Sequence, residues 1–139
     1  MESSLWSSKM NNQIIQTFIA SGAITEFALV SLDAANAGKV KITENGTDKA
    51  CVGIAQRAVA AGEAVEVVTS GLSRAIAGGN ITAATDPRLK AVTGTTGKVE
   101  TVASGDFAVC RMIPNINQTT AADNDQILVM FTGPVVVEP

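Results

Sequence analysis

Short runs in which apolar and polar residues alternate follow one another along most of the chain, a pattern typical of half-buried β-strands. In one run Val40 and Ile42 alternate with lysines, and in another Val65 and Val67 flank Glu66. No segment keeps a 3.6-residue apolar period over three turns, so we expect no long helix. The pattern indicates an all-β fold, a small barrel or sandwich. The predicted strands are 14–20, 27–32, 39–43, 50–55, 64–69, 73–76, 88–92, 98–102, 107–113, 126–131 and 135–137.

The sequence also contains an internal repeat. A Gly-Lys-Val sequence at 38–40 returns at 97–99, and several of the following residues match at the same spacing. We expect the shared glycines to occupy turns that need positive φ, a conformation that a side chain would penalise. The matched pairs are Gly46 with Gly105, Cys51 with Cys110 and, after a short insertion, Gly71 with Gly133.

The repeat predicts the domain organisation. An N-terminal arm and first strand, residues 1–20, would precede a single β domain at 21–139. Within that domain two similar β units, about 24–71 and 83–133, would pack around a pseudo-twofold axis and so complete the barrel or sandwich.

Two of the predicted strands are apolar on both faces. In 126–131 the odd-numbered residues share one face, and Leu128 and Met130 lie on the other. The strand 107–113 is apolar on both faces apart from Arg111. A strand buried on both sides needs two covering layers, supplied by the same chain or by a neighbouring subunit. The candidate subunit-interface residues are Leu128, Met130, Arg111 and Met112.

The first twelve residues differ from the rest of the chain. They are polar and rich in serine, they fall outside the repeat, and their few apolar residues are isolated. Two interpretations stay open: a frayed terminus, or an arm that orders on contact with a partner and uses Trp6 as an anchor. For the second, the candidate contact residues are Leu5, Trp6 and Met10.

Composition excludes several classes of function. The chain has no His and no Tyr, which excludes His-based catalytic and metal sites. Net charge is −3 and the ten Lys and Arg are scattered, so we expect no nucleic-acid partner. No apolar run approaches the ~20 residues of a membrane span, and no signal peptide is expected, so we predict synthesis in a cytoplasm and no membrane partner.

The remaining candidates for chemistry are few. Cys51 and Cys110 lie among apolar neighbours in predicted strands, where a reduced thiol is inert. Asp123 and Asp125 are interpreted as part of a solvated loop, because a calcium site needs more oxygen ligands at set spacing. We therefore expect no enzyme activity, no cofactor and no metal.

Several segments together resemble a known family, the small phage capsid cement proteins that decorate phage heads. The matching segments are Ala23-Ile24, Gly38-Lys39-Val40, Val52-Gly53-Ile54-Ala55, 62–71, Gly97-Lys98-Val99 and Ile127-Leu128-Val129. The second half departs from the family pattern at two places. Ala84-Thr85-Asp86 stands where Ala-Gly-Asp is usual, and Arg111-Met112-Ile113 replaces the second Val-Gly-Ile, which puts the subunit contacts there in doubt.

The resemblance implies a function as well as a fold. It implies a β-tulip-like homotrimer on the exterior of a phage capsid, made in the host cytoplasm and assembled into the virion. Such a protein clamps adjacent copies of the major capsid protein and so stabilises the shell, often with an N-terminal arm. The alternative is another virion component, of a tail or fibre, or a carbohydrate-binding β module.

Overall fold

A computed structural model of the chain describes residues 13–136, and within that range it is all-β, as predicted. The predicted arm residues Leu5, Trp6 and Met10 lie outside the described range. The strands are β1 (Gln13–Ala20), β2 (Leu29–Leu32), β3 (Lys39–Ile42), β4 (Cys51–Ala55), β5 (Ala64–Ile76), β6 (Ile81–Thr82), β7 (Arg88–Ala91), β8 (Val99–Thr101), β9 (Phe107–Met112), β10 (Thr120–Ala121) and β11 (Gln126–Val136).

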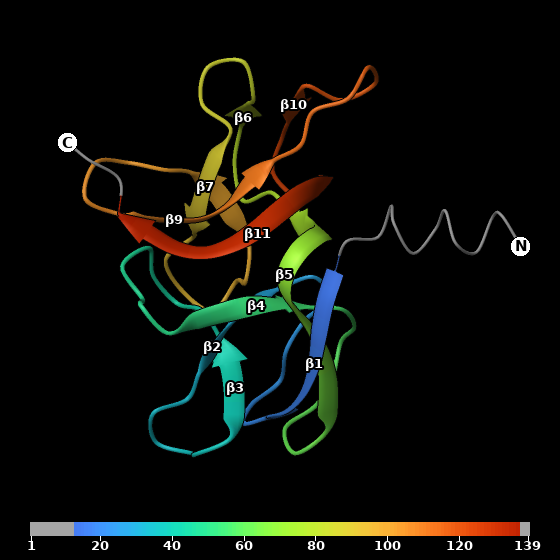
Figure 1. The fold of residues 1–139 in the computed structure, drawn as a ribbon, viewed down its shortest axis with the longest axis vertical. Helices are drawn as coiled ribbons and strands as arrows, with labels where there is room; N and C mark the ends of the chain where they lie inside the picture. The colour runs from blue at the N-terminus through green and yellow to red at the C-terminus, as the bar shows by residue number, and fades with distance from the viewer. Residues whose placement is uncertain (1–12, 137–139) are drawn as a thin grey trace, which may run out of the picture.

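The first half of the chain forms a closed barrel of five strands, in the lower part of Figure 1. Its order is β1-β3-β2-β4-β5, and β1 closes it by pairing with β5 as well as with β3. The alternation seen in the sequence explains its inside, because Val40, Val65 and Val67 are all fully buried. The buried residues of this core are Ala20, Ile24, Ala28, Val30, Val40, Ile42, Ala55, Val59, Val65 and Val67.

The second half continues the same sheet upward from β5, in the order β5-β11-β9-β7-β8 (Figure 1). A parallel bridge between Ala77, just after β5, and Val99 in β8 connects the last strand of this order to the end of β5. The core of this half also takes in residues of β2 and β4. Its largest fully buried members are Phe131, Leu29, Ile54, Ile81, Leu89, Met112 and Ile127.

Strand β5 belongs to both halves. The sequence predicts two strands here, 64–69 and 73–76, but the structure has one strand of 13 residues that passes through Gly71. Gly71 has φ 103° and Gly133, which lies within β11, has φ 89°. The predicted positive φ of these two glycines is confirmed, but they lie within strands instead of ending them. A glycine accepts this backbone conformation without the steric cost of a side chain.

The hydrogen bonds of the first half recur in the second. Ser21 N donates to Val40 O at 2.9 Å, and Gly78 N donates to Val99 O at 2.7 Å. In the same way, Ala20 N donates to Glu63 O, and Ala77 N donates to Asp125 O. The first strand of the second half is therefore the end of β5. The domain boundaries at 1–20 and 21–139 stay a prediction.

Two details of the sequence alignment need correction. Val30 pairs with Ile42 on one side and with Gly53 on the other. Leu89, its counterpart in the second half, pairs with Thr101 and with Cys110. The strand pairing therefore places Cys110 at the position of Gly53, and not at that of Cys51. Gly46 is not among the glycines with positive φ. Its turn is held by the Asn45 side chain, which accepts a hydrogen bond from Thr47 N at 3.0 Å.

Candidate interaction face

The outer face of the sheet around β11 carries a compact group of apolar and basic side chains. Met130 lies opposite Leu72 of β5 on one side and opposite Arg111 of β9 on the other. Leu128 lies opposite Arg74 in the neighbouring row. Directly opposed residues of antiparallel strands point to the same face of the sheet. These five residues are called the β11 face below.

The position of this face follows from the sequence of β11. Ile127, Val129 and Phe131 are buried in the core with at most 2% of their surface exposed. Because side chains alternate along a strand, Leu128 and Met130 must point outward, where they are half-buried. Two large apolar side chains of β11 therefore stand on the outside of the second half.

A hollow of about 320 Å³ lies beside the β11 face. Along β5, Val67 and Val68 lie between β1 and β4, and Gly71 lies between β1 and β11. Strands β4 and β11 therefore share the edge of β5 that lies opposite β1. The hollow is lined by residues of β1, β5 and β11 and by Phe27 and Gln56, which lie just before β2 and just after β4. Its lining residues are Gln13, Phe27, Gln56, Leu72, Ser73, Arg74 and Leu128.

The two arginines of the β11 face differ from the other arginines of the chain. Arg57 contacts Glu66 at 2.7 Å, and Arg88 contacts Asp86 at 2.9 Å. Within residues 13–136 neither Arg74 nor Arg111 forms an ion pair, and both side chains are exposed. The β11 face therefore combines apolar surface with positive charge that no acid between residues 13 and 136 pairs, in a chain whose net charge is −3. Arginine suits contacts with carboxylates at interfaces.

The predicted interface residues separate into two groups. Leu128, Met130 and Arg111 come together on the β11 face, as the pairing above shows. Met112 has 0% of its surface exposed and belongs to the core of the second half. Its side chain points to the opposite side of β9 from Arg111, so in this fold Met112 has no surface to offer a neighbouring subunit. That part of the interface prediction is corrected.

Sequence reasoning missed Leu72 and Arg74. Their inward-facing neighbours on β5 are Ser73, buried with 4% exposed, and Ala75, fully buried. Small side chains are favoured there because the Gln56 amide reaches across from the end of β4 and donates to Ser73 Oγ at 2.9 Å. Hydrophobicity alone therefore suggests that Leu72 points into the core, whereas Ser73 and Ala75 do so. The signal that was available is the alternation itself, because the odd-numbered positions that are buried at Val65 and Val67 stay buried at Ser73 and Ala75.

Both cysteines of the described residues are buried. Burial raises the pKa of the Cys51 thiol to about 11, and burial also raises the pKa of Cys110. A thiol with a raised pKa is a poor nucleophile at neutral pH. Residues 13–136 contain no group of three or more His, Cys, Asp or Glu side chains that could hold a metal ion.

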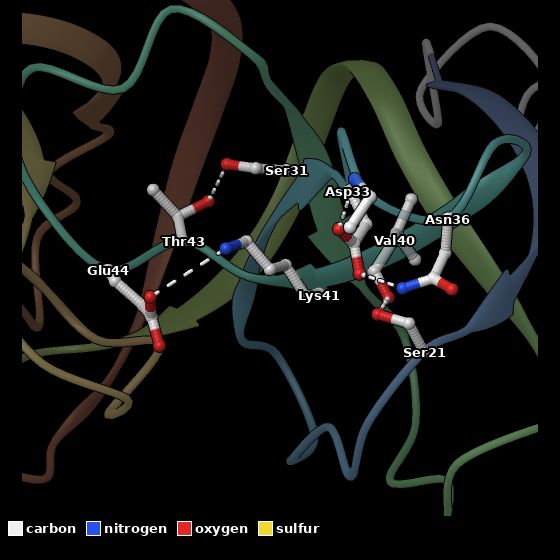
Figure 2. A network of polar contacts seen from close by, with 9 residues as sticks. Ser21, Ser31, Asp33, Asn36, Val40, Lys41, Thr43 and Glu44 are labelled. Carbon is white, nitrogen blue, oxygen red and sulfur yellow. Dashed lines mark hydrogen bonds and ion pairs between the residues drawn. The ribbon is translucent and has the colours of Figure 1, made fainter.

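Figure 2 shows the polar contacts around β2 and β3, which stabilise the fold. Ser31 Oγ and Thr43 Oγ1 form a buried hydrogen bond of 2.7 Å between side chains. Asp33 accepts hydrogen bonds from Asn36 Nδ2 and from Ala35 N, both at 3.0 Å. The hydrogen bonds from Asn36, Ser21 and Ala35 lower the pKa of Asp33 to about 2. These contacts hold the turn between β2 and β3 and leave no open group for a ligand.

Among the described residues no helix is long and apolar enough to cross a membrane. Comparison with known proteins finds a similarity of structure. No family model matches the chain, and no curated protein is similar to it. Among solved structures, it is similar to the head fiber gp8.5 N base of bacteriophage phi29, with a TM-score of 0.62 and 13% sequence identity. The match covers 88% of this chain and 98% of the phage chain. At this identity the likeness establishes a shared fold.

Proposed function

We propose that this chain is a structural protein of a phage virion, which binds the exterior of the capsid as a symmetric oligomer and stabilises the shell. The observation that carries the proposal is the shared fold with a phage head fiber base over 98% of that chain. The sequence resemblance to cement proteins leads to the same class of protein by an independent route. The expected oligomer is a homotrimer, and the expected partner is the major capsid protein.

The β11 face supports this proposal physically. A decoration protein needs contacts with other proteins and no reactive group, and we propose no catalytic role. Leu72, Leu128 and Met130 offer apolar surface, and Arg74 and Arg111 offer charge for carboxylates of a neighbour. Several linked copies would bind a symmetric shell by avidity, which can exceed the affinity of one copy by ~10²–10⁴.

Sedimentation with isolated shells of the parent phage tests the proposal. We expect the full chain to co-sediment with shells and to raise the temperature at which they release DNA. Deletion of residues 1–12 should leave the fold intact and weaken attachment, because the arm residues Leu5, Trp6 and Met10 would be lost. Attachment unchanged by the deletion would exclude the arm, and no attachment by the full chain would exclude the function.

The oligomeric state is a separate test. Light scattering at micromolar concentration should give a mass of a small symmetric oligomer, with three copies expected. A monomer under these conditions contradicts the oligomer, and the sedimentation assay then decides whether attachment survives without it.

A second candidate is the base of a fibre, because the similar solved structure is described as a head fiber base. The two candidates differ in what the particle carries. A decoration protein covers the shell with compact protrusions, whereas a fibre base continues into an elongated chain. A cryo-EM map of the parent particle distinguishes them.

A further inference from the structure

The β11 face and its hollow lack a covering partner among residues 13–136, and the segment with the best access to them is the N-terminal one. Gln13 is the first residue of β1 and also lines the hollow. Its Nε2 donates to Leu72 O at 2.8 Å, so the chain enters the described fold at the edge of the β11 face. Trp6 precedes Gln13 by seven positions, a span of up to about 24 Å when extended.

The composition of the segment complements the face. Beside Met1, its large apolar residues are Leu5, Trp6 and Met10, and its two charged side chains are Glu2 and Lys9. The face offers apolar surface next to Arg74 and Arg111, which make no ion pair within the described range. The hollow of about 320 Å³ has room for one large aromatic side chain. Tryptophan carries both the large apolar area and an N–H donor suited to a partly polar hollow, where Gln13 and Gln56 offer carbonyl oxygens.

A second copy of the chain fits this surface less well. If two copies met face to face about a twofold axis, Arg74 and Arg111 of one would approach the same arginines of the other. Like charges brought together in an interface are unfavourable. The N-terminal segment brings apolar side chains and two opposite charges, Glu2 and Lys9, so its side chains add no net positive charge to the face. Its attachment at Gln13 also gives it a high effective concentration there.

We propose that residues 5–10 of the same chain fold back from Gln13 onto the β11 face, with the Trp6 side chain in the hollow and Glu2 near Arg74. The proposal concerns the free protein and does not rest on the capsid function. If the same three apolar side chains also contact a shell, then docking on the β11 face and contact with the shell are alternative uses of one segment. Binding to a shell would then release the segment and uncover the β11 face.

Intrinsic fluorescence tests this directly, because Trp6 is the only Trp and the chain has no Tyr. In the full chain without shells, we expect blue-shifted emission and weak quenching by acrylamide, both unchanged on dilution. The emission of a Trp in water would overturn the proposal. A spectrum that shifts to the red on dilution would also overturn it, since the segment would then occupy the face of another copy.

Matched variants locate the binding surface. Leu128→Gln should shift the Trp6 emission to the red, whereas the same change at Leu32, which is 45% exposed on β2, should leave it unchanged. Arg74→Glu, at an exposed side chain, provides a second test that does not disturb the core. It should also shift the emission to the red, and adding Glu2→Arg should reverse part of that shift. Emission unaffected by both Leu128→Gln and Arg74→Glu, in folded variants, would overturn the proposal.

Discussion

The two halves of the molecule share one order of strands but differ in how they are closed and in what they expose. The first barrel has its own first strand, β1, paired with β5 along most of its length, whereas the second borrows the end of β5. On the first barrel Arg57 and Lys41 are paired with acids on the surface. On the second half, the β11 face presents apolar side chains beside two arginines that form no ion pair within residues 13–136. Both halves leave apolar side chains exposed, among them Ile14, Ile15 and Leu32 on the first, so the second half is distinguished by the arginines beside its apolar surface.

The largest effect is expected for Val129→Asp. Val129 is fully buried in the core of the second half, so the substitution places an unpaired charge in an apolar site. We expect a loss of about 4 kcal/mol or more in unfolding free energy, enough to abolish the cooperative transition. The measurement is urea denaturation followed by circular dichroism. Leu128→Asp, one residue away on the outer face, is the control and should retain the fold.

The junction between the halves gives the next largest effect. Gly97 has φ 70°, and a Cβ there would lie 2.4 Å from the Ala28 Cβ across the junction. Leu29 N also donates to Gly97 O at 2.9 Å, which holds the backbones together. We expect Gly97→Ala to cost about 3 kcal/mol, from left-handed strain and overpacking together. Gly94→Ala shares the positive φ but meets no atom within 4 Å, so equal losses would refute the packing argument.

Acid should weaken the first half through Asp33. Its pKa falls from 3.8 to about 2 on folding, chiefly through the hydrogen bond from Asn36. A lowered pKa contributes stability above the unfolded value, and this contribution is lost as pH falls through about 2. Thermal melting between about pH 5 and pH 2 should therefore show a shallower decline for Asp33→Asn than for the wild type. Parallel curves for the two proteins would remove Asp33 from the acid response.

The smallest effect on stability is expected at the β11 face itself. Arg111 is exposed and unpaired within the described residues, so Arg111→Glu should change the unfolding free energy by less than about 0.5 kcal/mol. Binding to shells should nevertheless fall. Lys49→Glu makes the same change of charge at an exposed lysine of the first half and should leave binding unchanged. Equal losses of binding for both variants would indicate a general charge effect and no specific role for the face.

The features that were predicted correctly from the sequence are those that depend on alternating apolar and polar residues. Val40 and Ile42 point inward as expected, and the two-faced pattern of 126–131 found Leu128 and Met130 on the outside of a buried strand. The pattern could not show that β5 is shared, because the two stretches on either side of Gly71 look like separate strands. It also missed β6 and β10, which pair over only two residues each and leave no periodic signal.

The error at Met112 has a related cause. Residues 107–113 are apolar on both faces, and the sequence does not say which face is covered by the chain's own core. The structure places Met112 on the inner face in one cluster with Leu89 and Phe131, whereas Arg111 is exposed on the outer one. Whether a two-faced strand is covered from within or by a neighbour depends on contacts distant in the sequence, which no local pattern records.

The sharing of β5 has a consequence for how such chains can grow. Adding a second barrel to the first required only four new principal strands, since the end of β5 serves as the fifth. Strand β11 runs past Gly133 as β5 runs past Gly71, with the same left-handed glycine at the point of transition. The last residues of β11 nevertheless pair with Ala108 and Phe107 of β9, whereas β5 beyond Gly71 pairs with the next half. A designer who extends the molecule by tandem fusion would therefore have to continue β11 beyond these pairs before a further unit could begin.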